Sequence, residues 1–397
     1  MSSLVEQWNI HPEHFWLHGK RPAKIVEYDE KLQMWNIYGY PESIEVLSRP
    51  KVFSNDSAYL SPIPIDPSIC EGDFAQMDPP EHRKVRGLVD RSFTPRLVAD
   101  MEPRVHRVVE ELLDDIADRD RFDLVADFAN PLPVLVISDL LGVPRSDRPL
   151  FKNWMHQLLD GAEELAPPET LEEMEAQLEK GFALLREMRD YWSEHAADRR
   201  RTPREDLLSH LVHAEVDGER LSDGAVFNIA NRLLIAGHHT TSMLIANTML
   251  CLEAFPDQAE RVRADRSLMP GLIEESIRFL SPLSGIMRVV AEDTEVGGHH
   301  FAKDQMVMVW CGAANRDERQ FADPNVFDAA RSPNVHIGFG RGVHFCLGRR
   351  LARAEGRAAV DALLDRFPAL RTDPDQAPTF FRVIDASGLE SMPVLTR

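Results

Sequence analysis

The chain has 397 residues, with 45 Lys and Arg against 65 Asp and Glu, which gives a formal net charge of −20. This acidic balance argues against nucleic acid and against an anionic membrane surface as partners. The cysteines are widely spaced and form no C-x-x-C pair, so they indicate neither a disulfide framework nor a zinc site: Cys70, Cys251, Cys311 and Cys346.

The first residues, Met1 to Gly19, mix Trp, His and Glu and contain no apolar core of signal-peptide or anchor length. We therefore expect a soluble, cytoplasmic protein. The sequence contains no Gly/Ser linker, low-complexity run or internal repeat. This predicts one domain over residues 1–397, and we expect a monomer.

The N-terminal part of the chain predicts a strand pair followed by helices. Residues 25–28 and 35–38 alternate apolar and polar side chains, as strands do. From residue 79 onward the pattern is mainly helical. Asp78 is a good N-cap, Pro79 suits a first helical position, and Glu81 has the spacing of a capping box.

The longest helical pattern covers residues 223–255, after Ser222 and before Pro256. A helix of that length would extend roughly 50 Å, enough to cross the whole domain. A second helix is predicted over residues 268–280, capped by Ser267.

The C-terminal third alternates short strands with a final helix. Residues 289–290 and 306–309 are rich in Val and Met and predict strands. A helical run then starts at Leu347 and ends near Phe367. The predicted architecture is mainly α with a minor β portion.

The stretch from Phe339 to Gly348 carries the strongest chemical signal, because it has the form F-G-x-G-x-H-x-C-x-G. A cysteine before a helix can be held as a thiolate, since the helix dipole and free amides lower its pKa. The glycines allow tight turns and close approach of a planar cofactor. A cysteine thiolate can ligate haem iron and favour cleavage of the O–O bond. The alternative for Cys346 is a buried structural cysteine beside a glycine-rich turn.

This stretch resembles the haem-ligand loop of the cytochrome P450 superfamily. Three further stretches resemble signatures of that family in the same order: Asp78 to His82, Ala236 to Thr241 and Glu275 to Arg278. The resemblance implies the cytochrome P450 fold, a haem b cofactor and Cys346 as the ligand of its iron, with Phe339 and Gly348 beside it. Length and composition are similar to those of the bacterial branch.

The resemblance further implies that four side chains bind the haem propionates: His82, Arg86, Arg288 and His344. Two buried carboxylates require such donors. His82 and Arg86 are four residues apart and so share one helix face. Taken alone, these two residues would fit a solvated helix face better, and the presence of Cys346 reverses that preference.

Glu275 and Arg278 can pair on one helix, and in the family this pair is buried behind the haem and is often joined by a later arginine. Here Val326 occupies the position of that arginine. The third member is therefore missing or supplied from elsewhere.

The resemblance assigns oxygen activation to the long helix. Small Ala236 and Gly237 would leave room above the iron, and Thr240 would hydrogen-bond the bound oxygen and direct proton delivery. His239 occupies the place of the usual acid, and we predict that it relays protons. The alternative is that His239 packs against a neighbouring helix. A metal site at His238 and His239 is rejected, because adjacent helical residues point about 100° apart.

Substrate specificity is predicted for four regions: residues 59–72, 150–190, 282–287 and Phe380-Phe381. Seven glutamates lie between Glu163 and Glu179 without a Lys or Arg. They fit a solvated helix face, or an acidic mouth for a cationic substrate such as an amino-sugar macrolide. Residues 275–282 and 313–317 are weakly similar to bacterial macrolide hydroxylases.

The expected function is a monooxygenase that hydroxylates or epoxidises a lipophilic small molecule, such as a macrolide or polyketide. Electrons would come from NAD(P)H through ferredoxin and ferredoxin reductase, which would dock near Arg83, Lys84, Arg349 and Arg350. Alternatives are a steroid, terpenoid or fatty-acid hydroxylase of the same fold, including a peroxide-driven one. A haem-binding sensor or carrier without turnover is an alternative from another class.

Overall fold

The computed structural model describes residues 10–57, 60, 71–155, 157 and 171–397. Its main helices are α2 (Tyr40–Ser48), α4 (Glu81–Ser92), α5 (Pro95–Ile116), α6 (Pro131–Leu141), α7 (Arg148–Met155), α9 (Leu171–Arg201), α10 (Leu207–His213), α11 (Asp223–Ala254), α12 (Pro256–Ala264), α13 (Met269–Phe279), α14 (Cys311–Ala314) and α15 (Arg349–Arg366). Short helical turns include η3 (Phe74–Gln76) and η8 (Gly342–His344). The predicted architecture, mainly α with a minor β portion, is confirmed.

Strands form one larger sheet and several small ones. The larger sheet has the order β1 (Val26–Asp29), β2 (Met34–Ile37), β10 (Met306–Val309), β7 (Ile286–Val290) and β3 (Phe53–Ser54). The smaller sheets pair β11 (Arg371–Thr372), β14 (Pro393–Leu395) and β4 (Arg121–Asp123); β12 (Thr379–Phe380) and β13 (Leu389–Ser391); β5 (Glu215–Val216) and β6 (Glu219–Arg220); and β8 (Thr294–Val296) and β9 (His299–Phe301).

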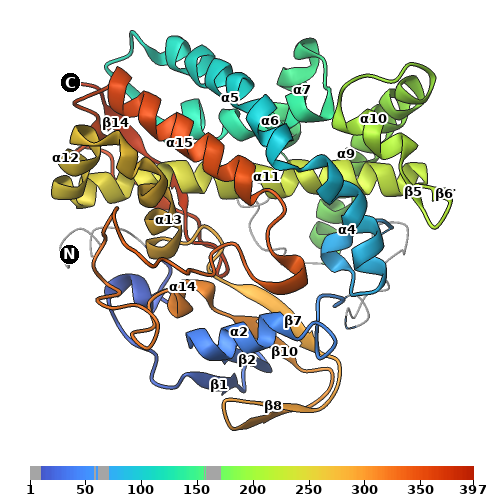
Figure 1. The fold of residues 1–397 in the computed structure, drawn as a ribbon, viewed down its shortest axis with the longest axis horizontal. Coiled ribbons are helices and arrows are strands. Elements are labelled where there is room, and N and C mark those ends of the chain that lie inside the picture. Colours follow the sequence, from blue (N-terminus) through green and yellow to red (C-terminus); the bar gives the residue numbers. More distant parts are fainter. Residues whose placement is uncertain (1–9, 58–59, 61–70, 156, 158–170) are drawn as a thin grey trace.

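The predicted strand pair at the N-terminus is confirmed as β1 and β2, which run antiparallel. β10 then adds to β2 in parallel and to β7 in antiparallel register. This sheet, with α2 beside it, lies below the long helix in Figure 1, while α5 and α6 lie above that helix. The sheet positions Arg288, on β7, at the edge of the cavity described below.

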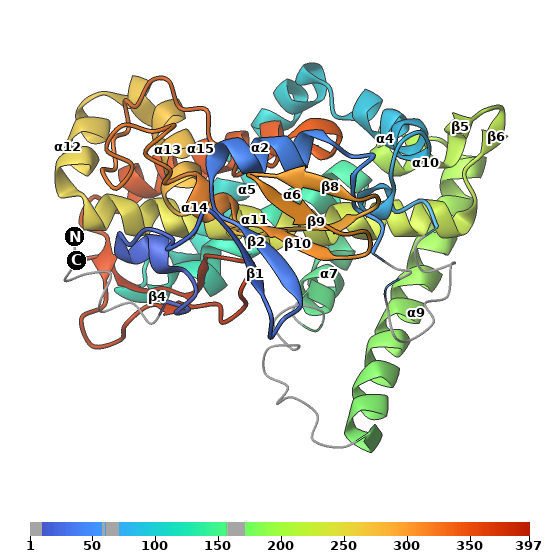
Figure 2. The ribbon, with the colours of Figure 1, turned by 90° about the horizontal axis from the view of Figure 1, so that it is seen from below.

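Helix α11 is the long helix expected from the sequence, and it crosses the full width of the molecule (Figure 1). It begins where the hydroxyl of Ser222 accepts a hydrogen bond from the amide of Ala225 at 3.0 Å, and it ends before Pro256. Helices α6, α9, α13 and α15 pack around it. Residues in its middle therefore lie at the centre of the protein. By contrast, α9 leans out from the body in Figure 2.

The predicted cap of α4 is wrong. The helix begins at Glu81 without a side-chain cap. The carboxylate of Asp78 instead accepts hydrogen bonds from the amide of Asn55, at 3.1 Å, and from the hydroxyl of Ser54. Because the carboxylate of Asp78 makes these tertiary hydrogen bonds, it is not available to cap α4. Ser267 likewise does not cap α13, which begins at Met269.

The missing partner of the Glu275–Arg278 pair is supplied by Arg331. Glu275 and Arg278 are fully buried and form two hydrogen bonds of 2.7 Å. Nε of Arg331 donates to Oε1 of Glu275 at 3.0 Å, five residues after the expected position. Val326 contributes only its carbonyl oxygen, which accepts from Arg278 at 3.1 Å and from Arg331 at 2.8 Å. The buried charges are thus compensated.

Most of the loop over 59–72 lies outside the described residues, and so does the first part of the predicted glutamate-rich mouth, residues 163–170. Within the described part, no helix is both long and apolar enough to cross a bilayer.

Candidate haem and oxygen site

One cavity of about 360 Å³ brings together signature residues that are far apart in the sequence. Nine of the predicted site residues line it: Arg86, Ala236, Gly237, Thr240, Arg288, Phe339, His344, Cys346 and Gly348. His82 lies behind them, with its ring centroid 4.2 Å from that of His344. His239 is not part of the lining.

The loop before α15 presents Cys346 to the cavity through tight turns. The amide of Cys346 donates to the carbonyl oxygen of Phe339 at 3.0 Å. Gly340 and Gly342 have φ angles of +68° and +75°, which L side chains rarely adopt. A Cβ on Gly342 would also clash with the carbonyl oxygen of Leu47 in α2. The loop is therefore fixed between α2 and α15.

Burial raises the pKa of the Cys346 thiol, and this outweighs the lowering by the amide of Gly348 and by the charge of Arg86. The sequence predicted a lowered pKa, on the assumption that the helix starts at Leu347. It starts two residues later, at Arg349. Without a bound cation the thiol form is thus favoured, whereas metal coordination deprotonates a thiol outright.

Two histidines with buried, unpartnered ring nitrogens lie beside two buried arginines, Arg86 and Arg288. Both ring nitrogens of His82 and Nε2 of His344 are buried without a hydrogen-bond partner in the described structure. Burial lowers the pKa of His344 to about 3 and that of Arg288 to about 10, and the neighbouring cations add to the shift in His344. Arg86 donates to the carbonyl oxygen of Phe345 and lies 3.5 Å from Asp90.

Buried donors without acceptors are rare, so this set calls for an anionic ligand. The two propionates of a haem would supply the missing acceptors, and Cys346 on the same cavity would supply the iron ligand. The residues present therefore fit a haem.

The middle of α11 forms another wall of the cavity. Small Ala236 and Gly237 line it, and a Cβ on Gly237 would meet nothing within 4 Å. The hydroxyl of Thr240 donates to the carbonyl oxygen of Ala236 at 2.9 Å. That bond directs the hydrogen toward the helix, so the lone pairs of the Thr240 oxygen can accept from a water or ligand.

His239 lies at the edge of the face of α11 that lines the cavity, close in helical position to Arg232 and Ala236, but it is not part of the lining itself. Its ring stacks on Phe381, with centroids 5.4 Å apart and planes inclined by 29°. Its predicted role as a proton relay stays a prediction.

Glu355 is a cavity residue that the sequence reading missed. It lies on α15, lines the cavity and is buried, and its Oε2 has no hydrogen-bond partner in the described structure. Burial alone raises its pKa to about 8. The signal in the sequence is a lone carboxyl among small residues: Ala354, Gly356, Ala358 and Ala359.

The remaining lining is mostly apolar and contains part of one predicted specificity region. From residues 282–287, the cavity takes Pro282, Leu283 and Ile286. Phe74 and Leu233 add further apolar surface. An apolar wall above polar anchors suits a lipophilic ligand.

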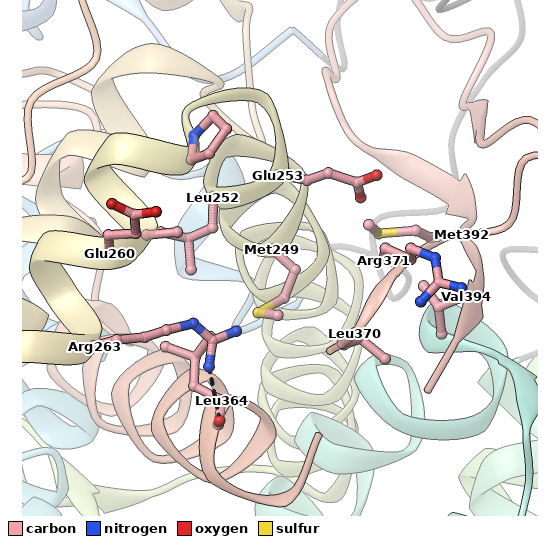
Figure 3. A pocket seen from close by; sticks show the side chains of 12 residues that line it. Met249, Leu252, Glu253, Glu260, Arg263, Leu364, Leu370, Arg371, Met392 and Val394 are labelled. Carbon is pink, nitrogen blue, oxygen red and sulfur yellow. Dashed lines mark hydrogen bonds between the residues drawn. The ribbon is translucent and has the colours of Figure 1, made fainter. Parts of the chain in front are cut away.

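A second cavity of about 290 Å³ lies between the end of α11, α12 and the strands β11 and β14 (Figure 3). Its lining mixes Met249, Leu252 and Met392 with charged Glu253 and Arg263. It includes no residue of the four signature stretches. We therefore place the chemistry in the first cavity.

Comparison with known families agrees with this geometry. The family model described as Cytochrome P450 matches residues 5–384. Among characterised proteins, the cyclomarin C epoxidase CymV of Salinispora arenicola is 41% identical over 89% of this chain and 88% of its own length. The erythromycin C-12 hydroxylase of Saccharopolyspora erythraea is 35% identical over 91% and 88%.

Solved structures of cytochrome P450-type enzymes are also similar to this chain. A structure from a study of unusual cytochrome P450-like monooxygenases in microbial secondary metabolism has 62% identity and a TM-score of 0.92, covering 98% of this chain and 100% of that chain. The hydroxylase HmtN of himastatin biosynthesis has 52% identity and a TM-score of 0.89, with both chains fully covered.

Proposed function

The chain belongs to the cytochrome P450 family and is a haem b-dependent monooxygenase, and we propose that it hydroxylates or epoxidises a lipophilic natural product such as a macrolide or other polyketide. One observation carries the proposal. A single cavity joins Cys346, the side chains of Arg86, Arg288 and His344, and the small-residue face of α11. Relatives named for cyclomarin, erythromycin and himastatin support a natural-product substrate.

In this proposal Cys346 holds the iron, and His82, Arg86, Arg288 and His344 hold the propionates. Phe339 and Gly348, which line the same cavity as Cys346, would lie beside the bound ring. When bound, the haem supplies the redox chemistry that activates dioxygen.

The chain's own residues supply space and protons. Insertion of one oxygen atom consumes a substrate C–H or C=C bond, O2, two electrons and two protons, and releases water. Ala236 and Gly237 leave room for oxygen and substrate beside the helix. Thr240, anchored to the carbonyl of Ala236, accepts a hydrogen bond from an ordered water and so holds a proton donor in place. The apolar lining excludes other water.

The two electrons come, in this proposal, from NAD(P)H through ferredoxin reductase and ferredoxin. Phe345, beside the cysteine, is partly exposed, and Arg83 and Arg350 are exposed. Lys84 already pairs with Asp217, and Arg349 donates to the carbonyl oxygen of Cys346 at 2.8 Å. Arg83 and Arg350 are therefore the better candidates for contact with an acidic ferredoxin.

The carbon monoxide complex of the reduced protein tests the central assignment. We expect the red-shifted Soret band of thiolate ligation in the wild type, and its loss in Cys346→Ser. Cys311→Ser is the matched control, because Cys311 is buried and does not line the cavity. A wild-type band typical of histidine-ligated haem would contradict the assignment.

Turnover assays separate the proposed enzyme from the alternatives. A monooxygenase should consume NADPH with a surrogate ferredoxin and reductase and form product from a bound substrate. Turnover with peroxide alone would indicate the peroxide-driven hydroxylase, and binding without turnover would indicate a sensor or carrier. Spectral titration with macrolides, steroids and fatty acids identifies the substrate class.

A further inference from the structure

We propose that His239 is a positioning residue that holds the C-terminal segment 381–388 against α11 and thereby fixes one wall of the substrate cavity. This rests on the proposed function, since the wall is argued to contact substrate. It replaces the relay role that the sequence predicts for His239.

Three residues at helical spacing form a seam between α11 and the segment 381–388. His239 stacks on Phe381. One turn later, Met243 forms a small apolar cluster with Phe381 and Ala386. A further turn on, the side-chain amide of Asn247 donates to the carbonyl oxygen of Ser387 at 2.9 Å. Residues four apart share a helix face, so the seam is continuous.

The segment 381–388 is in turn bonded to the cavity wall. The amides of Ser284 and Gly285 donate to the carbonyl oxygen of Asp385 at 2.8 and 3.0 Å, and the amide of Ser387 donates to that of Pro282 at 2.9 Å. Leu283 forms a β-bridge with Ala386. Pro282 and Leu283 line the cavity. A shift of Phe381 would therefore move the wall.

His14 anchors the middle of the same segment. Its ring is buried and hydrogen-bonds the carbonyl oxygen of Ile384 at 2.8 Å and the hydroxyl of Ser387 at 3.2 Å. With this anchor in place, the stack on His239 fixes the beginning of the segment.

The geometry favours positioning over proton transfer. Thr240 lines the cavity and His239 does not, as expected for neighbours that diverge by about 100° on a helix. The two roles also require different chemistry. Stacking needs a flat ring, whereas a relay needs an ionisable group. Phenylalanine preserves only the first property, and glutamate preserves only the second.

Azole binding to the haem-loaded protein tests the proposal without turnover. Imidazole is small and reaches the iron alone, while clotrimazole is bulky and presses on the cavity walls. Both affinities are read from the shift of the Soret band. We expect His239→Ala and His239→Glu to weaken clotrimazole binding about two- to tenfold, the range for loss of an aromatic pair. Imidazole binding should not change.

His239→Phe should restore clotrimazole affinity to the wild-type value. In a Phe381→Leu background, His239→Ala should have no further effect, because the stack is already lost. Phe380→Leu is the matched control for loss of a buried aromatic at the adjacent position, and it should leave the effect of His239→Ala intact.

If all three His239 variants bound clotrimazole with the affinity of the wild type, the positioning role would be wrong. A loss in His239→Phe as large as in His239→Ala would also contradict it. These outcomes are distinct from failure of the proposed function, which would show as the absence of the thiolate-type carbon monoxide band in the wild type.

Discussion

At the residue scale, Glu355 is a buried carboxyl group, and its Oε2 has no hydrogen-bond partner among the described residues. Its pKa of about 8 in the folded protein lies above its ordinary value of 4.5. The folded protein therefore binds the proton more tightly than the unfolded chain does. As pH rises between these values, the unfolded chain ionises first and stability falls.

Glu355→Gln should remove this pH dependence. Because burial raises the pKa of Glu355 to about 8, the wild type should lose at most about 3–5 kcal/mol of unfolding free energy between pH 5 and pH 8. We expect the variant to be no more stable than the wild type at pH 5 but more stable at pH 8, as measured by denaturant midpoints. Glu110→Gln, at an exposed ion pair, serves as control. A parallel pH dependence in both proteins would contradict the buried neutral acid.

Thr240 is the second residue whose role gives a clear expectation. Thr240→Ala removes the hydroxyl that is proposed to hold the proton-donating water. NADPH oxidation should continue, but a larger share of the electrons should appear as hydrogen peroxide and product should fall about tenfold or more. Thr240→Ser should retain most of the coupling. Unchanged coupling in Thr240→Ala would remove Thr240 from proton delivery.

At the element scale, the helix ends that are set by a local capping residue or a proline were predicted correctly. The helix ends that depend on tertiary contacts were not. Ser222 and Pro256 delimit α11 because a cap and a proline act on their own helix. Asp78 fails as a cap because its carboxylate is bound to Asn55 and Ser54, which are remote in the sequence. The contact of His239 with Phe381 could not be predicted for the same reason, because the two residues are 142 positions apart in the sequence.

The loop after α14 shows a further limit of sequence reading. Arg331 reaches Glu275 because the loop around residues 323–334 folds back on itself, with both Arg278 and Arg331 bound to carbonyl oxygens of that loop. The spacing of residues along the sequence does not predict that this loop folds back and brings Arg331 to Glu275. The predicted signature residues that line the cavity could be found, because each lies within a short local pattern.

Arg331→Leu should therefore destabilise the protein although the residue lies outside the cavity. It would leave the buried carboxylate of Glu275 with fewer donors, at a cost of about 2–4 kcal/mol. Arg366→Leu, which breaks two exposed ion pairs, should cost less than about 1 kcal/mol. Denaturant unfolding measures both, and equal effects would show that Arg331 contributes no more than a surface pair.

At the scale of the whole molecule, the charge balance sets the conditions for electron transfer. A chain of net charge −20 would repel the acidic ferredoxin proposed as its electron donor, so that proposal requires a local basic surface to guide docking. Arg83→Glu together with Arg350→Glu should slow reduction by a ferredoxin about three- to tenfold at low salt and flatten its salt dependence. Arg397→Glu with Lys24→Glu makes the same change in net charge and should have little effect. Equal slowing by both pairs would exclude a local docking surface.

The bond between His14 and Ile384 joins residues 370 positions apart. During synthesis, this contact cannot form until nearly the whole chain has left the ribosome. The loop with Cys346 emerges earlier than the segment 381–388 that completes the wall. Such a long-range contact also carries a high closure entropy, so it forms late in folding. The wall formed with segment 381–388 is therefore among the last parts of the cavity to be completed.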